Sequence, residues 1–123
     1  MRFVYKHYPL SIHPLAPGAH AAAAAAQRQG KFWEMYALIF ENRQSLDRAS
    51  YVAHAQKLGL DTAQFEKDLD SPEVKQAVDS DVALAEELQI RGTPGFFING
   101  RFLSGAQPYA AFKSVIDEEL ERN

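Results

Sequence analysis

The stretch from Gly92 to Pro108, GTPGFFINGRFLSGAQP, constrains the fold more than any other part of the chain. Two short strand-forming runs, Phe96 to Ile98 and Arg101 to Leu103, flank the dipeptide Asn99-Gly100. An Asn-Gly pair between such runs is the strongest short-range hairpin signal, because both turn residues must take positive φ. The sequence therefore predicts an antiparallel hairpin over residues 95–104.

Helical signals dominate the rest of the chain. Alanine has the best intrinsic helix propensity, and capping residues and glycines punctuate apolar positions that recur every three or four residues. A helical insertion is predicted over about residues 14–89, followed after the hairpin by a helix over 108–121. The expected helices of the insertion are an Ala-rich helix that stops at Gly30, a helix in KFWEMYALIFEN, one over about Asp47–Leu58, one opened by the Asp61/Gln64 capping pattern, and one from Ser71-Pro72 to about Gln89.

The N-terminal stretch Arg2–Tyr5, RFVY, is rich in β-branched and aromatic residues and predicts a short strand over residues 2–5. A chain of 123 residues is long enough for one core and needs no second domain. We therefore expect a single α/β domain over residues 1–123.

Composition excludes several classes of partner. The net charge is −3 and the 13 Lys and Arg residues are scattered, which argues against nucleic-acid binding. The longest apolar run, Ala21–Ala26, is far short of the ~20 residues that span a bilayer, and no secretory signal is recognisable. The chain contains no cysteine, so it has no disulfide, no thiolate metal ligand and no cysteine nucleophile.

In its motifs, the chain resembles the DsbA-like thiol-disulfide oxidoreductases of the thioredoxin superfamily. The resemblance is carried by RFVYKHYPL with its following His13-Pro14, by QGKFWEMYALIFEN, by LGL with a Phe five residues on, and above all by RGTPGFFINGRFLSGAQP. These pieces follow the family's order over nearly the whole chain. Gly95 departs from the family, which more often has a polar or β-branched residue there, and is expected to loosen the start of the strand.

The resemblance implies a partial thioredoxin-like fold that lacks its central N-terminal strand. Family members carry, before the RFVY-type strand, another strand, a Cys-x-x-Cys motif and the helix that the motif caps. Three arrangements remain open: the two parts of the sheet close directly, a second copy supplies strands, or the segment belongs to the native polypeptide. We expect a homo-oligomer, most simply a dimer, that completes the sheet. The family is mostly periplasmic or exported.

For function, the resemblance implies a protein-disulfide oxidoreductase domain, whereas the missing thiols predict that this chain is redox-inactive by itself, without catalytic residue or cofactor. One alternative is a module that binds peptides or partners. Another, suggested by SGAQP, is a remnant similar to the kappa-type glutathione transferases and isomerases.

The predicted substrate-binding residues are Thr93 and Pro94. The resemblance implies a cis proline whose preceding residue offers backbone hydrogen bonds to an extended peptide. The simpler interpretation of Thr93 and Pro94 is a tight turn before a strand.

Other candidates have simpler explanations. The four histidines, His7, His13, His20 and His54, lack the spacing of a zinc site and are expected at the surface or at caps, so no metal is predicted. Asp81 lies on the apolar side of its helix and is expected to be paired or partly exposed. The aromatic stripe in the second helix is expected to lie in the core and comprises Phe32, Trp33, Tyr36 and Phe40. The Ala run is expected to serve internal packing. The acidic tail is expected to be a solvated helix face and comprises Asp117, Glu118, Glu119 and Glu121.

Overall fold

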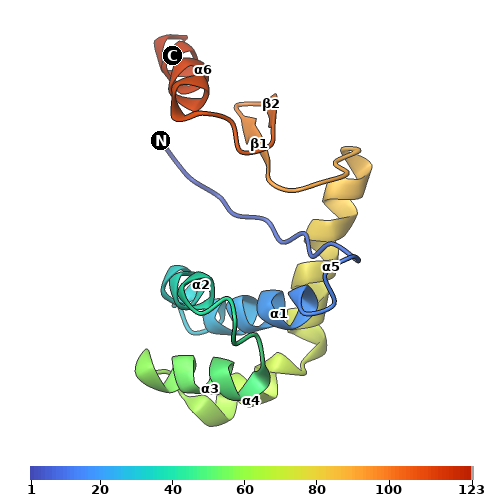
Figure 1. Cartoon of the computed structure of the whole chain (residues 1–123), viewed down its shortest axis with the longest axis vertical. Helices are drawn as coiled ribbons and strands as arrows, with labels where there is room; N and C mark the ends of the chain where they lie inside the picture. The colour runs from blue at the N-terminus through green and yellow to red at the C-terminus, as the bar shows by residue number, and fades with distance from the viewer. Residues whose placement is uncertain (123) are drawn as a thin grey trace. The chain divides into compact units, whose positions relative to one another are not determined.

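The computed structural model of the protein describes residues 1–122 and is mostly helical, with one small sheet. Figure 1 shows the elements in chain order. They are α1 (Ala16–Gln27), α2 (Phe32–Glu41), α3 (Arg48–Lys57), α4 (Thr62–Leu69), α5 (Pro72–Glu87), β1 (Gly95–Ile98), β2 (Arg101–Ser104) and α6 (Tyr109–Glu121).

Two compact units make up the chain, Met1–Leu84 and the part from Ala85 onward. The described sheet contains only β1 and β2.

The first unit is a helical bundle in which α1 contacts α2, α3 and α4 (Figure 1). Ala22–Ala26 are all buried, which confirms that the Ala run serves internal packing, because small side chains let neighbouring helices approach closely. The largest fully buried side chains are Phe65, Met35 and Val74, from α4, α2 and α5. Burying a side chain of this size contributes about 1.5–3 kcal/mol, so these three residues anchor the bundle.

Helix boundaries follow the predicted capping signals. The side chains of Asp47, Asp61 and Ser71 accept hydrogen bonds from the backbone N–H groups three residues on, at 2.8, 3.0 and 3.2 Å. After α1 and α3 the chain turns at Gly30 and Gly59, with φ of 76° and 75°. Only glycine takes this left-handed conformation without steric cost, and it ends each helix.

The capping pattern at α4 is only half formed. The Gln64 side chain does not accept from the Asp61 N–H, as a complete capping box requires, and its Nε2 donates to Asp68 Oδ1 at 3.0 Å. The Asp61 N–H donates to the Gln29 side chain at 2.9 Å, and Gln29 Nε2 returns a bond to the Asp61 carbonyl at 3.1 Å. The start of α4 is therefore tied to the end of α1.

Residues 2–5 do not form the predicted strand. A strand needs a hydrogen-bonded neighbour, and high β-propensity does not replace one. Phe3 and Val4 remain 62% and 54% exposed. The prediction for this segment was wrong for that reason.

The second unit contains the predicted hairpin. β1 pairs antiparallel with β2, from Gly95 opposite Ser104 to Ile98 opposite Arg101. Asn99 and Gly100 have φ of 48° and 85°, as a two-residue turn with positive φ at both positions requires. The final helix starts at Tyr109, one residue after the predicted 108, because Pro108 is its N-cap.

Candidate functional site

The loop that carries Thr93 and Pro94 is positioned by the end of α5. Ile90 N–H donates to the Ala85 carbonyl at 2.9 Å and Gln89 N–H donates to the Glu86 carbonyl at 3.0 Å. Gln89 takes φ of 59° between them, so α5 ends in a Schellman motif. This motif turns the chain out of the helix three residues before Thr93.

Pro94 is held against the far end of the hairpin. Its carbonyl accepts a 2.8 Å hydrogen bond from Gly105 N–H, and the Thr93–Pro94 peptide bond is cis. Gly105 has φ of 79°, and the Gln107 side chain donates to the Ser104 carbonyl at 2.8 Å. The start of β1 and the end of β2 are thus joined beyond the strand pairing.

Thr93 is exposed, as is Pro94. Within residues 1–122, the backbone N–H and C=O of Thr93 form no hydrogen bond. An exposed backbone amide with no partner can accept an extended chain by main-chain hydrogen bonds. The structure therefore leaves the predicted substrate-binding residue open to a ligand.

The two faces of the hairpin differ. Phe96 packs edge-on against Phe112 of α6, with ring centroids 4.7 Å apart. On the opposite face, Phe97 and Phe102 form a cross-strand pair at 5.0 Å and remain 46% and 52% exposed. We call this pair the Phe97/Phe102 face.

Gly95 allows the Phe102 ring to lie close to the strand. A Cβ at position 95 would lie 3.3 Å from Phe102 Cε2, tighter than ordinary van der Waals contact. Gly95 nevertheless pairs with Ser104, so the strand begins where it was predicted to be loosened.

Charged groups fix the hairpin to α6. Arg101 Nη1 lies 2.8 Å from Glu118 Oε2 and 3.3 Å from Glu119 Oε2. Its hydrogen bond lowers the pKa of the Glu118 carboxyl. Glu119 is buried, so the prediction that the whole acidic tail is a solvated face was wrong at this residue, where Arg101 and Arg122 neutralise the charge.

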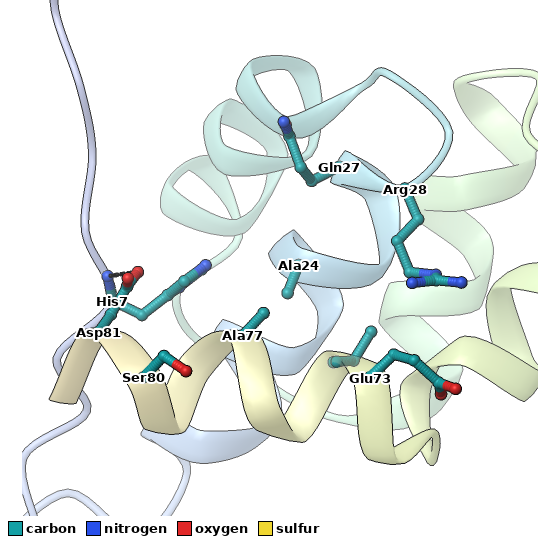
Figure 2. Close-up of a pocket in the computed structure, with 9 residues that line it drawn as sticks. His7, Ala24, Gln27, Arg28, Glu73, Ala77, Ser80 and Asp81 are labelled. Atoms are coloured by element: carbon teal, nitrogen blue, oxygen red, sulfur yellow. Dashed lines mark hydrogen bonds between the residues drawn. The ribbon is translucent and has the colours of Figure 1, made fainter. Parts of the chain in front are cut away.

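A second candidate site is an open groove in the first unit with a volume of about 380 Å³. Figure 2 shows its lining, with His7 and Asp81 together at one end and Arg28 and Glu73 toward the other. His7 N–H donates to Asp81 Oδ2 at 2.9 Å, and Lys6 Nζ lies 3.7 Å from Asp81 Oδ1. Asp81 is therefore paired, as expected.

The histidines are not all superficial. His7 is only 8% exposed, and its Nδ1 lies 2.9 Å from Nδ1 of His20. The prediction of surface or capping histidines was wrong for this pair, which nothing in the sequence connects. His13 is exposed, and no group of three or more possible metal-ligating residues forms within residues 1–122.

Aromatic rings surround the histidine pair. Tyr5 lies 5.4 Å from Phe32 and 5.5 Å from Tyr36, measured between ring centroids. Phe32 is buried as predicted, but Trp33 and Phe40 are 45% and 54% exposed. The predicted aromatic core is therefore only partly enclosed.

No helix within residues 1–122 is both long and apolar enough to cross a membrane.

Comparison with known proteins identifies the family of the chain. The family model described as a DSBA-like thioredoxin domain matches residues 2–117. The crystal structure of a thioredoxin-like oxidoreductase from Silicibacter pomeroyi DSS-3 superimposes with a TM-score of 0.82 at 26% identity, over 96% of this chain and 68% of that one. These matches confirm the predicted partial thioredoxin-like, DsbA-like fold with a helical insertion.

Curated relatives are longer proteins. The chain is 37% identical over 117 residues to the Na(+)/H(+) antiporter NhaA of Herminiimonas arsenicoxydans, and 35% identical to Na(+)/H(+) antiporter NhaA 3 of Salinispora tropica. These matches cover 95% and 94% of this chain but 18% of each relative. The chain thus spans about a fifth of the length of these relatives.

Proposed function

Because the chain belongs to the DSBA-like thioredoxin domain family, we propose that it binds extended polypeptide at the Thr93–Pro94 loop without exchanging disulfides itself. The observation that carries the proposal is the open backbone of Thr93 in a chain without cysteine. The resemblance to the family implies that this loop binds peptides, and a chain without cysteine has no thiol with which to exchange disulfides.

The absence of exchange follows from the chemistry. Disulfide exchange requires a thiolate that attacks a disulfide sulfur and leaves a mixed disulfide. Hydroxyl and imidazole groups do not form such an intermediate. The 123 residues therefore supply no group able to carry out this reaction by themselves.

Peptide binding is supported by the surroundings of the loop. Thr93 offers one donor and one acceptor, and Gly95 and Phe97 continue the same side of the chain along β1. In a two-residue hairpin Ile98 and Arg101 form the hydrogen-bonded pair next to the turn, so the N–H and C=O groups of Gly95 and Phe97 point away from β2. A peptide bonded to Thr93 can continue along this edge.

The test is binding of a fluorescent, unstructured, cysteine-free peptide, measured by anisotropy without added thiol. Thr93→Pro removes the N–H donor and should weaken binding about 2- to 10-fold, the worth of one net hydrogen bond. Gly92 precedes it and tolerates a following proline, since it has no Cβ to clash. Thr93→Ala keeps the backbone and is the matched control, with binding unchanged.

Two results would contradict the proposal: no binding by the wild-type chain, or equal binding by the wild-type and Thr93→Pro chains. A far-UV spectrum of each variant checks that the hairpin and helices remain folded.

The second candidate function is partner binding through the Phe97/Phe102 face. It is favoured by the exposure of two adjacent phenyl rings, because apolar surface of this kind is stabilised when a partner covers it. A homodimer is its simplest form. The kappa-type glutathione alternative would require retention on immobilised glutathione, which we do not expect.

A further inference from the structure

The N-terminal segment, residues 1–12, contains no helix or strand. Its contacts with the helices include those of Phe3 with Trp33 and of Lys6 with Asp81, and two further contacts lie at His7 and Tyr5. His7 bonds through its N–H to Asp81 of α5 and through its ring to His20 of α1. Tyr5 packs on Phe32 and Tyr36 of α2.

The ring-to-ring contact of His7 and His20 depends on protonation. Two Nδ1 atoms 2.9 Å apart form a hydrogen bond only if one carries a proton and the other presents a lone pair. A neutral pair meets this condition, and so does a pair with one imidazolium. When both rings are charged, two N–H groups and two positive charges face each other, and the contact is lost.

We infer that the His7–His20 pair is a proton-operated latch, which holds residues 1–12 on α1 and α5 and releases them when both imidazoles are protonated. His7 and Asp81 form one end of the groove in Figure 2, so release of the segment opens that end.

The groups around the pair place this event well below the ordinary histidine pKa of 6.5. Burial lowers the pKa of His7, with Asp81 opposing and Lys6 adding to the effect. Burial also lowers the pKa of His20 to about 4, with the neighbouring His7 adding to the decrease and Asp81 opposing it.

The phenol ring of Tyr5 also lies beside the pair. The pKa of Tyr5 is raised by burial, by Tyr36 and by Asp81, so its phenol stays neutral throughout. Arg28 and Glu73 line the same groove toward its other end.

Trp33 reports on the latch directly, because it is the only tryptophan in the chain. Its ring lies 5.5 Å from Phe3 and 6.5 Å from Tyr5, both in the N-terminal segment. We expect the fluorescence of Trp33 to shift to longer wavelength, reversibly, as the pH falls from 7.5 to 3.5, while far-UV helicity is retained.

His20→Gln is the decisive variant. Glutamine cannot take a proton, and its amide oxygen accepts from His7 Nδ1–H whether or not His7 is charged. The fluorescence transition should therefore be absent, whereas His13→Gln, which changes an exposed histidine, should retain it. A transition with the wild-type midpoint in His20→Gln would overturn the latch, because Asp81 and every other carboxylate are still present.

A second measurement needs no variant. The ring C2–H resonances of the wild-type chain should show His7 and His20 both protonated only well below the ordinary histidine pKa of 6.5, together with the Trp33 change. Protonation of both rings at the ordinary histidine pKa of 6.5 would refute the inference.

Discussion

Acid should destabilise the first unit through His20, and the size of the effect can be worked out. In the unfolded chain His20 takes up a proton at its ordinary pKa of 6.5, whereas in the folded chain its pKa is about 4. Between these values the unfolded state binds more protons, so the free energy of unfolding falls as the pH falls through this window.

The pKa difference sets an upper limit on the change in the free energy of unfolding, and the solvent exposure of His20 reduces it. The difference between the two pKa values corresponds to about 3 kcal/mol, since a tenfold change in proton affinity is about 1.4 kcal/mol. His20 keeps part of its surface in water, where charges are screened, so we expect about 1–2 kcal/mol.

The assay is urea unfolding of the wild-type and His20→Gln chains at pH 7.5, 6 and 4. The stability difference between the two chains should change in favour of the variant by about 1–2 kcal/mol from the highest to the lowest pH. Carboxylates titrate equally in both chains and cancel. A difference that stays constant with pH would refute the reasoning.

Three further predictions concern local structure and association. Asp61→Ala should lower the free energy of unfolding by about 1 kcal/mol through loss of the α4 cap, whereas Asp79→Ala, on an exposed helix face, should change it by less than about 0.5 kcal/mol; matched urea titrations compare them. Gly100→Ala should destabilise the hairpin by about 1 kcal/mol, because Gly100 has positive φ, seen as faster amide exchange in β1. The wild-type chain should sediment as a dimer at micromolar concentration and Phe97→Ser with Phe102→Ser as a monomer; a monodisperse wild-type monomer would contradict this.

Local signals in the sequence predicted most of the elements. Asn99-Gly100 indicated the hairpin and its register, because its turn geometry is specified by two adjacent residues. Asp47, Asp61 and Ser71 marked three helix starts for the same reason. Each signal acts within three residues of its effect.

Predictions that depended on distant partners failed. Residues 2–5 have strand propensity but form no strand within residues 1–122. The His7–His20 contact joins an irregular segment to a helix and has no spacing rule that announces it. Glu119 looked solvated within its acidic run, yet Arg101 lies 18 positions away in the sequence and pairs with it.

The loop at Thr93 was predicted only in part. Its residues were identified through resemblance to the family, while its open backbone depends on how α5 ends and how Gly105 binds Pro94. The Schellman motif at Gln89 gave no sequence signal, because glutamine rarely takes positive φ.

The most direct test of the account is a paired measurement on the purified 123-residue chain: the rate of disulfide exchange, by insulin reduction with dithiothreitol, alongside anisotropy binding of a cysteine-free peptide. We predict an exchange rate equal to that of the buffer and saturable peptide binding that Thr93→Pro weakens. An exchange rate above the buffer rate would contradict it.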